Sequence, residues 1–174
     1  MSAPKLYICS PERLAKNGAA WYADAAALAE RYGFSLLMPP AEAFCPKSTR
    51  EEGRKLAKAR AALIAQCDLL IADTRDFRNE LEPHAEAGFA LGYAHGLGKK
   101  IYCYMPDART CAERYGKAVY SPGSEGEGAY VHEDGMSLEP GPLNLMLSSP
   151  APVVEGGLEE VLKRAAQDFF GEVK

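Results

Sequence analysis

The chain has 174 residues, of which 47% are hydrophobic and 25% charged, so it is long enough to bury a sizeable core and has ordinary globular composition. Its formal net charge is -4, and lysines and arginines are scattered, which argues against a nucleic-acid polymer or an anionic membrane as a partner. No apolar run approaches the roughly 20 residues of a membrane span, and the first residues lack a signal peptide's apolar region, so we expect a cytoplasmic protein.

The five cysteines predict neither a disulfide framework nor a zinc site, because their number is odd and none is spaced as C-x-x-C. Three of them, Cys9, Cys67 and Cys103, lie in or beside apolar runs. A thiol in such a place packs as a small apolar group.

Strands and helices are predicted to alternate along the chain. Short apolar runs indicate strands, and apolar residues three and four positions apart indicate helices. The expected strands are 5–9, 34–38, 68–72, 100–105 and 152–154, and the expected helices are 18–32, 49–66, 83–96, 107–115, 142–148 and 158–170.

This alternation predicts an α/β fold with right-handed crossovers: a five-stranded parallel sheet in the order 2-1-3-4-5, with helices on both faces. We expect a single domain over residues 1–174. Within it, 117–141 is rich in glycine, proline, serine and glutamate and is expected to form a long loop or lid.

Polar side chains follow two of the predicted strands, and strand ends meet at one edge of a parallel sheet. Ser10 follows the first strand and Asp73 the third, and the loop after Asp73 carries Phe77, Arg78 and Glu82. An aromatic face beside carboxylates suits a heterocyclic base and a sugar hydroxyl. The alternatives are an Asp73 that caps the next turn and a Phe77 that anchors a solvated charged loop.

A phosphorylatable receiver aspartate is a second interpretation of Asp73, and the sequence excludes it. A receiver also needs an acidic pair after its first strand to hold magnesium. That position here reads Cys9-Ser10-Pro11.

His84 and Glu86 lie in the first turn of the helix that we expect to begin at Pro83. A carboxylate there is stabilised by the helix dipole and stays ionised, which suits a nucleophile or a metal-free general base. A glutamate with a purely structural role is equally common in a first turn. His84 could likewise cap the helix or lie exposed at the surface, without a role in the site.

Five segments resemble the nucleoside 2-deoxyribosyltransferase family, and they span nearly the whole chain in the right order. The I-A-D-x-x-x-F-R-x-x-x-E-P loop and the N-L-M-L segment are far more specific than a single glycine pattern. The segments are KLYICSP at 5–11, CDLLIADTRDFRNELEPH at 67–84, FALGYA at 89–94 followed by GLGKKI, ERYG at 113–116 and GPLNLML at 141–147.

The resemblance implies a flavodoxin-like fold and transfer of a 2-deoxyribosyl group between nucleobases. In the family a glutamate forms a covalent glycosyl-enzyme intermediate with retention, and no metal or cofactor is used. By position, Tyr7 matches the tyrosine that orients the nucleophile, Asp73 the acidic strand end, and Phe77 with Arg78 the loop over the base.

Asn144 and Met146 match the segment that, in the family, reaches into a neighbouring subunit's pocket near the sugar. The resemblance therefore implies a homo-oligomer whose pockets are shared between subunits. Its other partners would be a nucleoside or nucleotide and a free nucleobase.

Three positions depart from the family pattern. The nucleophile position is Ala90, the aspartate that handles the base is His84, and an Asn or Asp of the preceding helix is Arg60. Three explanations are open. Ala90 is an engineered substitution, Glu86 has taken over as the nucleophile, or the chain is a natural relative that binds a nucleoside or nucleotide without transferring its sugar. Takeover by Glu86 is disfavoured because one helical turn rises about 5.4 Å. Arg60 would suit a phosphate.

We therefore expect a pentosyltransferase of deoxynucleosides that lacks its nucleophile in this chain. One alternative is an N-glycoside hydrolase in which Glu86 or Asp73 activates water. The other is a non-catalytic nucleotide-binding protein.

Overall fold

The protein was analysed as a computed structural model, which describes residues 2–40, 49–77, 82–115 and 141–171. Five strands form one parallel sheet in the order β2-β1-β3-β4-β5, which confirms the predicted α/β architecture. The expected loop or lid at 117–141 lies, apart from Gly141, outside the described residues. The strands are β1 (Lys5–Cys9), β2 (Ser35–Leu36), β3 (Leu69–Asp73), β4 (Lys100–Met105) and β5 (Val153–Glu155).

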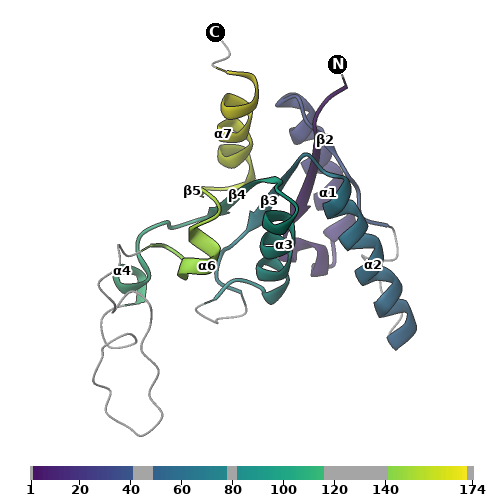
Figure 1. Cartoon of the computed structure of the whole chain (residues 1–174), viewed down its shortest axis with the longest axis horizontal. Coiled ribbons are helices and arrows are strands. Elements are labelled where there is room, and N and C mark those ends of the chain that lie inside the picture. Colours follow the sequence, from purple (N-terminus) through teal and green to yellow (C-terminus); the bar gives the residue numbers. More distant parts are fainter. Residues whose placement is uncertain (1, 41–48, 78–81, 116–140, 172–174) are drawn as a thin grey trace, which may run out of the picture.

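The helices cover both faces of the sheet (Figure 1). None of those within the described ranges is long and apolar enough to cross a membrane. They are the short 3-10 helix η1 (Pro11–Leu14) and the α-helices α1 (Gly18–Arg31), α2 (Arg50–Gln66), α3 (Ala85–Gly96), α4 (Cys111–Tyr115), α6 (Leu145–Ser148) and α7 (Leu158–Phe170).

Side chains alternate between the two faces of each strand and so divide the core into two clusters. Leu6 and Ile8 of β1 belong to the cluster that also holds buried residues of α1 and α7. Tyr7 and Cys9 belong to the opposite cluster, with buried residues of α2 and α3. Figure 1 shows α3 in front of the strands with α6 beside it.

Several boundaries differ from the predicted ones because side chains cap the backbone. α3 begins at Ala85 instead of Pro83, since His84 Nδ1 accepts a hydrogen bond from the Glu86 backbone N–H. α6 likewise begins after Asn144, whose side-chain oxygen accepts from the Leu147 N–H. The strand predicted at 34–38 has only two residues in the structure. The helix η1, which Ser10 caps, was not predicted.

Gly18 fixes the position of η1 against α1. It is the first residue of α1 and is buried. A Cβ atom at this position would lie 2.8 Å from the backbone carbonyl oxygens of both Glu12 and Arg13. The missing side chain therefore lets η1 fold back onto the helix and brings Glu12 and Arg13 to the carboxyl edge of the sheet.

We expect Gly18→Ala to lower the free energy of unfolding by about 1–3 kcal/mol, the usual cost of overpacking, because its Cβ would overlap two backbone carbonyls. Gly53→Ala is the matched control, since nothing lies within 4 Å of a Cβ at that position in α2. It should stabilise the protein by about 0.5–1 kcal/mol. Urea unfolding measures both variants, and equal midpoints would contradict a tight approach of η1 to α1.

Candidate active site

The ends of β1, β3 and β4 meet at Asp73, whose side chain is 1% exposed. Its Oδ2 atom accepts hydrogen bonds from the Ser10 hydroxyl at 3.0 Å and the Tyr104 hydroxyl at 3.2 Å. Its Oδ1 atom accepts from the Arg75 backbone N–H at 3.3 Å. Asp73 thus joins three strand ends through its own hydrogen bonds.

Arg75 links this carboxylate to η1. Its Nη2 atom lies 2.9 Å from Asp73 Oδ2 and also donates to Glu12. Burial raises the pKa of Asp73, and the charge of Arg75 partly offsets that rise. Asp73 is consequently an internal anchor whose oxygens already have protein partners.

A second carboxylate, Glu86, stands at the start of α3 between two guanidinium groups. Its Oε2 atom is 2.7 Å from Arg13 Nη2, and its Oε1 atom pairs with Arg60 Nη2. The three side chains are 21%, 12% and 18% exposed, respectively. Each oxygen of this carboxylate is thus held by a different arginine.

Tyr7 and Ala90 lie in the same buried cluster, between β1 and the helices α2 and α3. They are 3% and 1% exposed. Burial raises the pKa of Tyr7, and a hydrogen bond with Arg60 partly offsets the rise. Burial also raises the pKa of the neighbouring Cys9 to about 12, which removes this thiol as a nucleophile.

The two stems of the loop after β3 are tied together. Asp76 and Pro83 form an isolated bridge, and the Phe77 N–H donates to the Glu82 carbonyl at 3.2 Å. The ring of Phe77 meets that of His84 edge to face, with centroids 4.6 Å apart. Phe77 and His84 are thus held at the start of α3. Arg78 lies outside the described residues.

The segment before and within α6 lies against α3, where a Cβ at Gly88 would be 3.9 Å from Leu147 Cδ2. Asn144 is partly exposed, and its side-chain oxygen caps α6 at 3.2 Å from the Leu147 N–H. Met146 is 77% exposed. Within the subunit, this methionine faces solvent.

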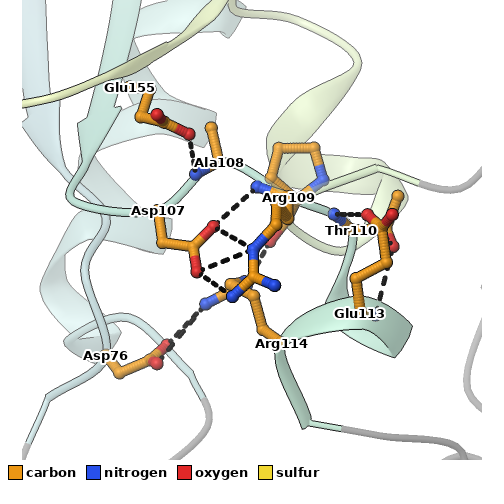
Figure 2. Close-up of polar contacts among 9 residues, drawn as sticks. Asp76, Asp107, Ala108, Arg109, Thr110, Glu113, Arg114 and Glu155 are labelled. Atoms are coloured by element: carbon orange, nitrogen blue, oxygen red, sulfur yellow. Dashed lines mark hydrogen bonds and ion pairs between the residues drawn. The ribbon is translucent and has the colours of Figure 1, made fainter.

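Arg114 of α4 connects these two segments, and its side chain is only 6% exposed. Its Nη1 atom donates to Asp76 Oδ1 at 3.2 Å, and its Nη2 atom donates to the Pro142 carbonyl. Figure 2 shows the guanidinium between Asp76 and the residues of the β4–α4 loop. The arginine sets the spacing between the loop that carries Phe77 and the chain that leads to Asn144.

The other polar contacts of Figure 2 shape the β4–α4 loop itself. Arg109 pairs with Asp107 at 2.6 Å, and its hydrogen bonds lower the pKa of Asp107 to about 2. The Ala108 N–H donates to Glu155 at 3.1 Å. These contacts satisfy the backbone without a helix, which is why α4 begins at Cys111 and not at 107.

The family of the chain follows from a sequence comparison. The family model for nucleoside 2-deoxyribosyltransferase matches residues 6–146. The chain belongs to this family. No curated protein sequence matches it.

Several solved structures share the fold. A 2-desoxiribosyltransferase from Leishmania mexicana is 26% identical, with a TM-score of 0.72 over 96% of this chain and 99% of its own. A 2-deoxyribosyltransferase from the psychrotolerant bacterium Bacillus psychrosaccharolyticus is 15% identical, with a TM-score of 0.56 over 95% and 93%. A conserved protein from Enterococcus faecalis V583 is 16% identical, with a TM-score of 0.58 over 93% and 99%.

For this nucleoside 2-deoxyribosyltransferase relative, the structure brings some of the predicted site residues into contact and leaves others apart. Ser10 contacts Asp73, and Phe77 contacts His84. Glu82 is exposed, and its side chain has no described contact with the other candidates. Among the described residues, no three His, Cys, Asp or Glu side chains gather as they would around a metal ion.

Sequence reasoning missed Arg13, Arg75 and Arg114. Arg13 and Arg75 stand next to segments that were singled out, but nothing in their spacing links them to a carboxylate 73 or 63 residues away. Arg114 lies within the ERYG segment that carries the family resemblance, and this was the one signal that could have found it.

We expect Arg114→Leu to lower the free energy of unfolding by about 2 kcal/mol, because the variant removes the hydrogen bonds that Arg114 donates to Asp76 and to the Pro142 carbonyl. Arg109→Leu is the control. The ion pair of Arg109 with Asp107 is exposed, so its loss should leave the unfolding midpoint nearly unchanged. Chemical unfolding followed by circular dichroism measures both. A midpoint that shifts equally in the two variants would contradict the special role of Arg114.

Proposed function

We propose that this chain binds a 2-deoxynucleoside or its nucleotide in the family's pocket but does not transfer the deoxyribosyl group. The observation that carries the proposal is Ala90. A methyl group, 1% exposed, stands at the position where the family has its attacking glutamate. Without a carboxylate at position 90, the family's covalent intermediate has no nucleophile there.

The roles proposed for the other residues follow from their places. Phe77 and His84 would cover the base at the start of α3, and Tyr7 and Ser10 would line the sugar side at the end of β1. Asp73 would hold the strand ends that carry these groups. Together they make a binding site whose polar groups are ordered before the ligand arrives.

The ion pairs favour binding over hydrolysis. A hydrolase needs a carboxylate that can accept a proton from water within hydrogen-bond reach. Both oxygens of Glu86 are engaged by arginines, and Asp73 accepts from Ser10, Tyr104 and Arg75. While these contacts last, neither carboxylate is placed to act as that base.

The test of the proposal uses the unaltered protein with 2-deoxynucleosides and free adenine. Isothermal titration calorimetry should record saturable binding of at least one deoxynucleoside or its 5-monophosphate. Chromatography of the same mixtures should show neither base exchange nor release of free sugar. Base exchange would overturn the loss of transfer, sugar release would establish the hydrolase, and no binding at all would refute the proposal.

Restoring the carboxylate should restore the chemistry. We expect Ala90→Glu to bring base exchange to at least about 100-fold above the background of the unaltered protein, a gain typical of one positioned catalytic group, and to give a deoxyribosyl adduct in the intact mass. The control is Ala90→Gln, which has the same size without a nucleophile. If Ala90→Gln folds and Ala90→Glu forms no adduct, the remaining pocket is not that of a transferase.

We further propose that a second copy of the chain covers the exposed face of α3 and α6 and completes the pocket. Phe89 and Tyr93 of α3 and Leu97, which directly follows the helix, lie four residues apart and are 64%, 36% and 43% exposed. The rings of Phe89 and Tyr93 stack with centroids 6.0 Å apart. Leu145 and Met146 of α6 add to this face. An apolar stripe of this kind on a soluble domain is typical of an interface.

We expect the protein to be an oligomer at micromolar concentration and Met146→Asp to dissociate it, because the substitution places a charge in the apolar face. Met38→Asp is the control. Met38 is also exposed, but it follows β2, an edge strand of the sheet, and is not part of the face formed by α3 and α6. Sedimentation velocity separates the species. A monomer in the unaltered protein would refute the shared pocket.

A further inference from the structure

Two arginines from different elements converge on the carboxylate of Glu86. Arg13 comes from η1 and Arg60 from α2, while Glu86 comes from α3. Each arginine engages a different oxygen of the same carboxylate. Arginine forks match the oxygens of carboxylate and phosphate groups, so the pair forms a receptor for an oxyanion.

The charges around this receptor favour an anion. Two guanidinium groups face one carboxylate, whereas the nearby Glu12 and Asp73 pair with Arg75. The N-terminus of α3 adds the partial positive charge of the helix dipole. A doubly charged phosphate in place of Glu86 would carry a charge equal and opposite to that of the two guanidinium groups.

Arg60 also has an unused donor. Its Nε atom is buried and has no hydrogen-bond partner among the described residues. A buried N–H group without an acceptor costs free energy, and a ligand with more acceptor oxygens than a carboxylate would recover it. A phosphate group offers such oxygens.

The receptor is also reachable. The Arg13, Arg60 and Glu86 side chains remain 12%, 18% and 21% exposed, so none is sealed from solvent. Glu86 lies in the first turn of α3, and its side chain can turn outward without unfolding the helix.

We propose that Arg13 and Arg60 bind the phosphate group of the ligand, and that Glu86 fills their site as an internal competitor when no ligand is bound. The inference rests on the proposed function, because it assigns a phosphate-bearing ligand class to the same site. It predicts that the chain prefers a 2-deoxynucleoside 5-monophosphate over the uncharged 2-deoxynucleoside.

Internal competition lowers the apparent affinity by the fraction of time for which the site is open. Glu86→Gln keeps the shape of the side chain but removes its charge. We expect this variant to bind a deoxynucleoside 5-monophosphate about 10-fold more tightly than the unaltered protein. This is the gain in affinity expected if Glu86 leaves the arginines open for about one-tenth of the time in the unaltered protein. Arg60→Gln should abolish the preference for the monophosphate over the nucleoside.

The experiment is calorimetry on the full chain, with a 2-deoxynucleoside, its 5-monophosphate and inorganic phosphate as three separate probes. Glu51→Gln is the matched control, because it removes one carboxylate that pairs with Lys55 on the exposed surface of α2. That control should bind like the unaltered protein. If Glu86→Gln does not fold, Arg60→Lys takes its place, and the loss of the fork should weaken binding of the monophosphate.

The outcomes separate the two proposals. Equal affinity for nucleoside and monophosphate in all variants, without binding of inorganic phosphate, overturns the phosphate site and leaves the proposed function standing. Tighter binding of inorganic phosphate to Glu86→Gln than to the control supports the phosphate site. If inorganic phosphate binds as tightly as the monophosphate does, free phosphate is the ligand of the site. Binding of phosphate without binding of either nucleoside probe keeps the site but refutes the proposed function.

Discussion

The hydrogen bonds to Asp73 are the interaction on which the candidate site depends. They join the Ser10 hydroxyl after β1, the Tyr104 hydroxyl of β4 and, through Arg75, the helix η1. A carboxylate that is 1% exposed is costly unless its oxygens are satisfied, so these partners hold one another in place. Asp73 thereby holds together the carboxyl edge of the sheet, where α/β folds bind ligands.

The second carboxylate of the candidate site is held by two ion pairs. Glu86 stands one turn before Ala90 on α3, but Arg13 and Arg60 hold both of its oxygens. A free carboxylate at position 90 would have faced the buried surface of Tyr7 and β1. If Ala90 stands in place of the family's attacking glutamate, as we propose, and Glu86 stays paired, the site is better suited to hold a ligand than to cleave it.

Much of the fold could be predicted from the sequence because it depends on local patterns. The apolar runs at β1, β3 and β4 and the spacing in α7 predicted those elements nearly residue by residue. The family motif also singled out Ala90, which lies buried on α3 in the same cluster as Tyr7. The arginine contacts could not be predicted, because they join residues far apart in the chain, such as Arg13 and Glu86, 73 residues apart. Pairing of this kind is set by the packing of η1, α2 and α3 and leaves no periodic signal.

The most direct test of this account is a crystal structure of the chain with an intact 2-deoxynucleoside. We predict that the anomeric carbon lies opposite the Cβ atom of Ala90. No carboxylate oxygen of Glu86 or Asp73 should then lie within about 3.5 Å of that carbon, the separation of a reactive pair. A carboxylate at that distance, or a sugar joined to one of these two residues, would contradict the claim that this chain binds without transfer.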